Sequence, residues 1–373
     1  EFLRQVALTG TGLAGCALFE PPAAAIHPSP SAPLAEAHVQ SLMADASVQW
    51  HLANPLGIQV DAGQDAWHAG HVNDVLAFAD GDGLLVGADT GGVWLITTAD
   101  QAIPLSDSWD VPDVTCLALG PDGPRHVYAG CWDGARGVGA LYEADASSAV
   151  PLLNWRSVPL PGGAGGVFRI GVLQGSRTLV LACLGGVFWS PIPGPGGNYT
   201  WKPARRLPGG TYSGLAIGPG ETVVAAAWGS APDQGLCGLF HGEWSGGELV
   251  MRRSFLQGAC AADMYRTSLA ACESQPNVIY AVSSREPSVP WIYAVLKSTD
   301  GGQSFSRLPT RATRGDTGIT APLESSDPDQ AGGQGQYNQC IAVSPGDPNL
   351  VLLGWRNGPW ISTDGGVNWD FRQ

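Results

Sequence analysis

Between residues 73 and 362 the chain repeats one pattern of short apolar segments. Each copy has an apolar segment, a turn rich in Pro, Gly or Asp, and a second apolar segment that ends in small residues. A third segment with an aromatic residue follows, usually after a glycine. The second segments end at Gly87, Gly130, Ala182, Ala226, Ala281 and Gly354, so successive copies lie 43, 52, 44, 55 and 73 residues apart. Short apolar segments bounded by turn residues are typical of β-strands.

A period of about 40–50 residues with several strands per copy indicates a β-propeller, in which each copy is one four-stranded blade. No segment has the 3.6-residue apolar period of a long amphipathic helix, so we expect an all-β fold. Val48–Leu52 fits an outer strand of a further blade. We therefore expect residues 48–373 to form a propeller with six visible blades, belonging to a seven-bladed ring that is incomplete at the C-terminus, because an open ring would leave strand edges unpaired.

The last two copies share the sequence S-T-D-G-G-x-[SN]-aromatic, at residues 298–305 and 362–369. In such a turn the Asp carboxylate accepts backbone N–H groups and the glycines adopt positive φ. These segments resemble the Asp-boxes of BNR (bacterial neuraminidase repeat) propellers of the sialidase superfamily. The segment 336–345, followed by Asp347-Pro348-Asn349, is similar to exported bacterial BNR-repeat proteins. The resemblance implies a structural role, away from the ligand face, for Ser298, Asp300, Gly302, Phe305, Ser362, Asp364, Gly366 and Trp369.

A turn in the first copy, Ala88-Asp89-Thr90-Gly91-Gly92, resembles the turn that carries a catalytic Asp in the first propeller of xyloglucanase-type glycoside hydrolases. That resemblance implies an inverting hydrolase with Asp89 as a catalytic carboxylate. Inversion requires a second carboxylate about 6.5–9.5 Å away, which in that family comes from a second ring. The alternative is that Asp89 is only a turn residue. A sialidase is disfavoured, because no early Arg-Ile-Pro sequence is present.

In propellers of this class the ligand face is built from the loops between the second and third strands and from those between blades. Loops on a rigid scaffold usually carry function, and an aromatic face can stack on a sugar ring. About half of the tryptophans should instead pack between blades. The candidate ligand-binding residues in these loops are Trp132, Arg136, Trp228, Tyr265, Arg266, Tyr337, Asn338, Trp355 and Arg356.

The first residues have the order of an export signal, with Arg4 ahead of a short apolar stretch. Leu13-Ala14-Gly15-Cys16 resembles a bacterial lipobox, which implies lipidation of Cys16, and Ala23-Ala24-Ala25 offers an alternative cleavage site. We expect residues 1–25 to be a twin-arginine-like or lipoprotein signal and residues 26–47 to be a Pro/Ala-rich tether. The expected location is the periplasm, the cell surface or the medium, with a membrane contact only through a lipid on Cys16.

Composition narrows the possible partners. The chain holds 19 basic and 33 acidic residues, a net charge of −14, which disfavours nucleic acid. No apolar run is long enough for an ordinary membrane-spanning helix. Eight cysteines are compatible with an oxidising compartment. Cys116 and Cys131 could pair across a hairpin, or all could be buried thiols. No metal site or cofactor is expected, because His68 and His71 have no evident third ligand.

These observations favour an exported propeller of the cell envelope that recognises a glycan or an envelope protein. The glycoside hydrolase built on Asp89 is the alternative, and an assembly factor for a membrane complex is a third possibility.

Overall fold

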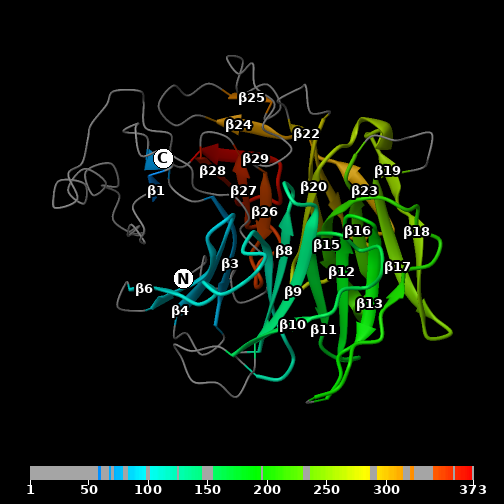
Figure 1. Ribbon diagram of the computed structural model, residues 1–373. Coiled ribbons are helices and arrows are strands. Elements are labelled where there is room, and N and C mark those ends of the chain that lie inside the picture. The colour runs from blue at the N-terminus through cyan, green and yellow to red at the C-terminus, as the bar shows by residue number, and fades with distance from the viewer. Residues whose placement is uncertain are drawn as a thin grey trace.

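The computed structural model describes residues 71–78, 83–97, 101–123, 126–144, 154–194, 196–229, 236–285, 292–310, 339–354 and 359–370. It also describes the backbone alone of 58–59, 67–68, 311–313, 320–322, 355, 358 and 371. Six sheets follow one another in chain order around a ring (Figure 1). The fold is an all-β propeller with six blades, as the repeat predicts. No described helix is long and apolar enough to cross a membrane.

Each blade contains a four-stranded antiparallel meander that runs from an inner to an outer strand. Blade 1 has β3 (Val72–Ala77), β4 (Gly83–Ala88), β5 (Gly92–Thr97) and β6 (Ala102–Pro104). Blade 2 has β7 (Val114–Leu119), β8 (Val127–Asp133), β9 (Val138–Ala144) and β10 (Trp155–Val158). Blade 3 has β11 (Val167–Leu173), β12 (Thr178–Cys183), β13 (Gly186–Pro191) and β14 (Lys202–Pro203).

Blade 4 has β15 (Tyr212–Ile217), β16 (Val223–Ala227), β17 (Leu239–Ser245) and β18 (Glu248–Arg253). Blade 5 has β20 (Thr267–Ala271), β21 (Ile279–Ser284), β22 (Ile292–Ser298) and β23 (Ser304–Arg307), extended by β19 (Phe255–Gln257). Blade 6 has β26 (Cys340–Val343), β27 (Val351–Trp355), β28 (Gly358–Ser362) and β29 (Asn368–Phe371), extended by β24 (Arg311–Thr313) and β25 (Thr320–Pro322). A separate pair joins β1 (Ile58–Gln59) and β2 (Trp67–His68).

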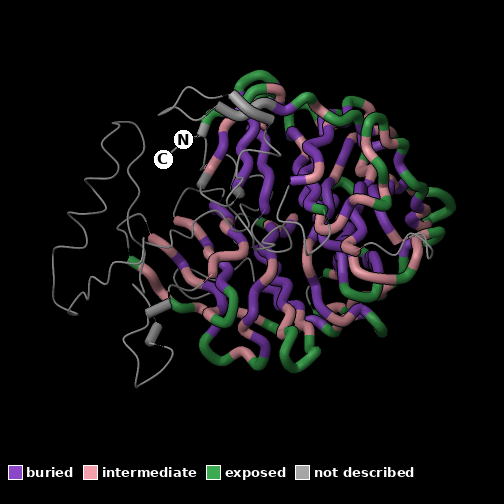
Figure 2. The backbone as a smooth tube through the Cα atoms, turned by 90° about the horizontal axis from the view of Figure 1, so that it is seen from above, coloured by how far each residue is buried: buried purple, intermediate pink, exposed green. Residues whose placement is uncertain are grey.

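The hydrophobic core is divided among the interfaces between blades. Five clusters of buried side chains each combine residues of two consecutive blades, from blades 1 and 2 through to blades 5 and 6. The strands β8, β12, β16 and β21 are therefore buried on both faces over most of their length. Figure 2 shows the buried strands within the ring and the exposed turns around them. Burial on both faces explains why these segments are continuously apolar rather than alternating.

Close approach of neighbouring blades explains the small residues at the ends of the second strands. A Cβ atom on Gly130 would lie 2.7 Å from both Cys116 Sγ and Val167 Cγ1. A Cβ atom on Gly87 would lie 2.6 Å from Val114 Cγ1. In both cases the valine belongs to the inner strand of the next blade, so the small residue lets the two blades meet.

The two S-T-D-G-G segments form matching turns between the third and fourth strands of blades 5 and 6. Ser298 Oγ accepts the Gly302 N–H at 2.8 Å, and Asp300 Oδ1 accepts the Ser304 N–H at 2.9 Å. Gly302 has φ of 90° and Gly366 has φ of 89°, which favours glycine. The aromatic residues that end the turns, Phe305 and Trp369, are fully buried. The turns thus anchor their hairpins to the core.

Short parallel additions join blade 4 to blade 5 and blade 5 to blade 6. After leaving β18, the chain pairs β19 with β23 of the next blade, and after β23 it pairs β24 with β29. A single bridge between Arg205 and Val250 does the same between blades 3 and 4. The expected strand at 48–52, the signal at 1–25 and the tether at 26–47 lie outside the described residues, and the seventh blade stays a prediction.

Candidate functional site

One face of the ring is formed by the loops that join the second to the third strand of each blade, and we call it the BC face. Its loops close in the same way in five blades. A residue at the end of the second strand or directly after it donates its N–H to the carbonyl of the residue before the inner strand. The N–O distances are 2.8 to 2.9 Å: Asp89 to His71, Trp132 to Asp113, Leu184 to Gly166, Trp228 to Thr211 and Ser284 to Arg266. The repeat thus brings functional residue types from successive blades onto one face. The S-T-D-G-G turns lie at the opposite ends of their strands.

A β-bulge follows the first residue of the inner strand in blades 1 to 4, at Asn73, Thr115, Phe168 and Ser213. Bulges redirect side chains and are common beside functional sites. Three of the four bulge residues donate a hydrogen bond to a carbonyl of the next blade. Asn73 bonds to Val114 at 2.8 Å, Ser213 bonds to Thr267 at 3.2 Å, and Thr115 bonds to Val167.

Phe168 is the exception, because its side chain has no polar group to donate. Its ring lies between two tryptophans of the BC face, with centroids 6.4 Å from Trp132 and 5.2 Å from Trp228, both edge to face. Arg266 continues the row, since its guanidinium carbon lies 5.9 Å from the centre of the Trp228 ring. We call Trp132, Phe168, Trp228 and Arg266 the aromatic row. All four side chains are partly exposed.

The row depends on a glycine of the loop before the third inner strand. A Cβ atom on Gly166 would lie 2.5 Å from the indole carbons of Trp132. The indole therefore lies flat against the backbone of blade 3. Trp132, Trp228 and Arg266 were expected from the sequence, and the structure brings them together. Phe168 was missed, because Val167-Phe168-Arg169-Ile170 looks like an uninterrupted strand and a single sequence does not reveal the bulge.

At its inner end the row closes with Arg266, and Arg169 and Gln339 lie beside that arginine. Arg169 donates to the carbonyls of Thr115 and Phe168 at 3.1 and 2.8 Å. Burial and the nearby charge of Arg169 lower the pKa of Arg266 to about 9. The buried Gln339 donates from Nε2 to the Arg266 carbonyl at 2.5 Å, while its Oε1 has no hydrogen-bond partner among the described residues. His71 Nε2 also has none, and burial lowers the pKa of His71, so its imidazole is neutral at pH 7.

Three carboxylates lie at the edge of the BC face in blades 1 and 2. Asp113 is buried, and its pKa is raised by burial and then by the charges of Asp89 and Asp133. Asp89 is exposed in its turn, where Thr90 has the unusual φ of 57° for a residue with a side chain. Asp133 forms an ion pair with Arg136, whose Nη2 also donates to the Asp110 carbonyl at 2.6 Å. Arg136 is thus occupied by protein groups.

Of the remaining residues that the sequence predicted, the structure describes only some. Tyr265 is half-buried on the BC face, and its N–H donates to the Ser284 carbonyl at 2.9 Å. Trp355 ends β27, but its side chain lies outside the described residues, as do Tyr337, Asn338, Arg356 and Cys16. No group of three His, Cys, Asp or Glu side chains in the described ranges could hold a metal ion. The seven described cysteines are free thiols, so Cys116 and Cys131 are not paired.

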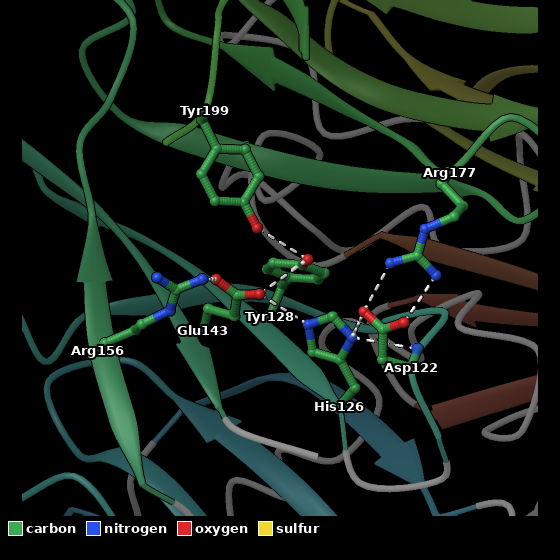
Figure 3. Close-up of polar contacts among 7 residues, drawn as sticks. All are labelled: Asp122, His126, Tyr128, Glu143, Arg156, Arg177 and Tyr199. Carbon is green, nitrogen blue, oxygen red and sulfur yellow. Dashed lines mark hydrogen bonds and ion pairs between the residues drawn. The ribbon is translucent and has the colours of Figure 1, made fainter. Parts of the chain in front are cut away.

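A second polar cluster has the residue types of an acid–base site, but it is enclosed between blades 2 and 3 (Figure 3). Glu143 is only 6% exposed and accepts hydrogen bonds from His126 Nε2 at 2.8 Å and from Arg156 at 2.6 Å. Tyr128 bonds both to Glu143 and to Tyr199 of blade 3, at 3.2 and 2.9 Å. Because the carboxylate is buried and satisfied, this cluster joins the two blades and does not present a group to a ligand.

Comparisons with known proteins bear on the fold. No protein-family model and no curated protein matches the chain. A chain in the "Crystal Structure of Mitotic Checkpoint Complex" has 13% identity and a TM-score of 0.50, with 82% of this chain and 75% of that chain covered. The GH74 enzyme of Niastella koreensis has 14% identity and a TM-score of 0.43, with 81% and 54% covered. The six sheets that follow one another around a ring show the fold, a β-propeller of six blades.

Proposed function

We propose that this propeller is a glycan-recognition module and that the aromatic row on the BC face binds the sugar rings. The supporting observation is that Trp132, Phe168 and Trp228 come from three consecutive blades and remain partly exposed. Aromatic side chains combine a large apolar surface with a specific geometry. A row of them suits a chain of several sugars better than a single small ligand.

The inner end of the row supplies polar groups for orientation. Arg266 offers a charged donor to hydroxyl or carboxylate groups. Gln339 Oε1 and His71 Nε2 are buried atoms that no described residue satisfies, and such atoms cost free energy unless a hydrogen-bond partner such as a ligand or water satisfies them. One sugar hydroxyl can donate to Gln339 Oε1, and another can donate to or accept from His71 Nε2. The net charge of −14 favours a neutral or weakly acidic glycan at this face over a polyanion.

The test is binding to a panel of plant and bacterial polysaccharides by isothermal titration calorimetry. Trp228→Ala and Phe168→Ser should each weaken binding about tenfold or more, which corresponds to about 1.4 kcal/mol. Serine occupies the equivalent bulge in blade 4, so Phe168→Ser should preserve the fold. Phe255→Ala is the control, since this aromatic is 68% exposed on β19, outside the row. The proposal would be overturned if Trp228→Ala and Phe168→Ser both bound every polysaccharide that the wild type binds with wild-type affinity.

A second candidate, hydrolysis of a polysaccharide, is favoured by the raised pKa of Asp113 beside Asp89 and Asp133. A glycosidase needs one carboxyl group that stays protonated and another that is ionised. Asp113 would then be the acid and Asp89 the base. Release of reducing ends from the same panel tests this. Activity that disappears in Asp89→Asn and Asp113→Asn but survives in Asp107→Asn supports it, and no release by the wild type excludes it for those substrates.

We also propose that the module acts outside the cytoplasm, in the cell envelope or beyond it. The support is the signal-like order of residues 1–25 and the Pro/Ala-rich segment 26–47. Fractionation of cells that express the full-length chain tests this. Lipidation at Cys16 predicts that Cys16→Ala moves the protein from the membrane to the soluble fraction, whereas cleavage after Ala25 predicts no change.

A further inference from the structure

A groove runs along the outer edge of blade 4, away from the BC-face row. It has a volume of about 650 Å³ and is lined by Arg205, Arg206, Glu243, Trp244, Ser245, Val250 and Arg252. We call these residues the rim groove. The hairpin of β17 and β18 forms one wall, and the segment that leaves blade 3 forms the other. In Figure 1, β18 lies at the outer edge of the ring.

The backbone fixes both walls. Arg205 donates its N–H to the Leu249 carbonyl at 2.8 Å and accepts the Met251 N–H at 2.9 Å. Trp244 is held by a hydrogen bond from Nε1 to the Glu221 carbonyl at 3.2 Å and by edge-to-face contact with Trp189. Both walls are therefore held by hydrogen bonds of the protein, one on the β17–β18 hairpin and one on the segment bridged to it at Arg205, as a preformed binding site requires.

Three arginines of the rim groove have no side-chain partner within the described part of the chain. Arg205, Arg206 and Arg252 make no ion pair or side-chain hydrogen bond with any part of the chain that the structure describes. Every other arginine with a described side chain has a partner. Arg136, Arg156, Arg177 and Arg285 form ion pairs, Arg169 and Arg253 donate to carbonyls, and Arg266 and Arg307 lie over aromatic rings. The unpaired arginines are thus gathered in one groove of an acidic protein.

The backbone conformation of Arg206 is a second, independent observation that indicates a ligand site. Its φ of 60° is in the left-handed region, where glycine is favoured and a side chain costs about 1 kcal/mol. Residues held in this region cluster at ligand sites, where a requirement for the side chain outweighs the strain. Arg206 directly follows Arg205 in the chain, and both line the groove. One carboxylate, Glu243, lines the same groove, so the groove keeps an excess of positive charge.

We propose that the rim groove binds an acidic polysaccharide through its carboxylate or sulfate groups. Guanidinium groups bind both anions through paired hydrogen bonds, and Trp244 supplies an aromatic face beside them. An extended peptide is disfavoured, because Arg205 already pairs with the edge of β18 at Leu249 and Met251. This site is separate from the aromatic row, and its existence does not depend on that proposal.

The probes are polygalacturonate, which carries carboxylates, and dextran sulfate, with neutral dextran for comparison. The full chain should bind one or both of the acidic probes and should not bind dextran. Replacing Arg205, Arg206 and Arg252 together by Gln should weaken that binding at least 30-fold. Arg252→Gln should weaken it several-fold, whereas Arg307→Gln should change it less than twofold. The last pair is matched, because both arginines are exposed on the fourth strand of neighbouring blades, β18 and β23.

Arg206→Gly separates binding from folding. It should lower affinity for the acidic probe several-fold and leave the thermal midpoint unchanged or higher, since glycine relieves the positive φ. Phe168→Ser should leave acidic-probe binding unchanged, so failure of the aromatic row is distinguishable from failure of the groove. Wild-type affinity in the triple variant, equal binding to dextran, or tighter binding to vesicles of anionic phospholipid than to either acidic probe would overturn the proposal.

Discussion

Single residues decide how closely the blades approach. In the middle of β8, Gly130 lies where the inner strand of the next blade passes, and the buried thiol of Cys116 is equally close. The sequence pattern of second segments that end in small residues follows from this contact. Phe168 has a different effect. The equivalent bulge residues of blades 1, 2 and 4 donate a hydrogen bond to the next blade, whereas Phe168 presents an aromatic ring there.

We predict that Gly130→Val lowers the free energy of unfolding by about 1–3 kcal/mol, because a Cβ atom and two methyl groups would enter space already filled by Cys116 and Val167. Urea denaturation followed by tryptophan fluorescence measures the change. Gly162→Ala is the control, since a Cβ atom at Gly162 would meet nothing within 4 Å. An equal effect of the two substitutions would contradict the packing argument.

Glu143 provides a prediction about pH. Burial alone would raise the pKa of its carboxyl group, but the hydrogen bond from His126 and the charge of Arg156 outweigh burial and hold the pKa below the ordinary 4.5. A depressed pKa stabilises the folded state above the unfolded-state pKa, and this contribution is lost as the pH falls through the folded-state value.

We therefore expect Glu143→Gln to lower the free energy of unfolding by about 2 kcal/mol at pH 7, through the loss of charged hydrogen bonds. The difference from the wild type should shrink below about pH 4.5, where the carboxyl group begins to protonate. Urea denaturation at pH 7 and at pH 3.5 measures it. A difference that stays constant between these two pH values would show that the charge of Glu143 does not stabilise the fold.

At the scale of elements, the regular parts of each blade were predictable and the irregular parts were not. The first three strands of every copy lie where the apolar segments and turns placed them, because their periodicity reflects burial between blades. The parallel additions β19 and β24 and the four bulges left no signal. A two- or three-residue pairing with the next blade depends on contacts about 40 to 60 residues away along the chain.

The turn at 298–305 gives a prediction at this scale. Asp300 accepts hydrogen bonds from the Ser304 N–H and hydroxyl and from Ser298, and these outweigh burial and lower its pKa. We expect Asp300→Ala to lower the free energy of unfolding by about 2 kcal/mol. Asp300→Asn should cost less, since its amide oxygen keeps one acceptor. Chemical denaturation measures both, with the exposed Glu273→Ala as control. An Asp300→Ala variant as stable as this control would show that the turn does not anchor the hairpin.

At the scale of the whole molecule, the period predicted the ring, but the candidate sites were predicted only in part. Trp132, Trp228 and Arg266 were chosen from loops whose position in the ring follows from the repeat. The rim groove was not anticipated, because Arg205 and Arg206 look like loop residues until the bridge to Val250 brings them against blade 4. Sequence periodicity reports neighbours within a blade far better than contacts between blades.

The division of the core among blade interfaces makes a prediction about unfolding. Displacing one blade exposes the clusters on both of its sides, so blades should not separate one at a time.

Free cysteines report on this, because six of the seven described thiols are buried, in blades 2 to 6, and Cys260 is exposed. The experiment uses the Cys16→Ser variant, because Cys16 lies outside the described residues. In this variant Ellman's reagent should modify one thiol quickly, that of Cys260. The other six should react together in one phase, at the rate of global unfolding. Several phases, each releasing one or two thiols, would show that blades open independently, and fewer than seven thiols after denaturation would show that disulfides form.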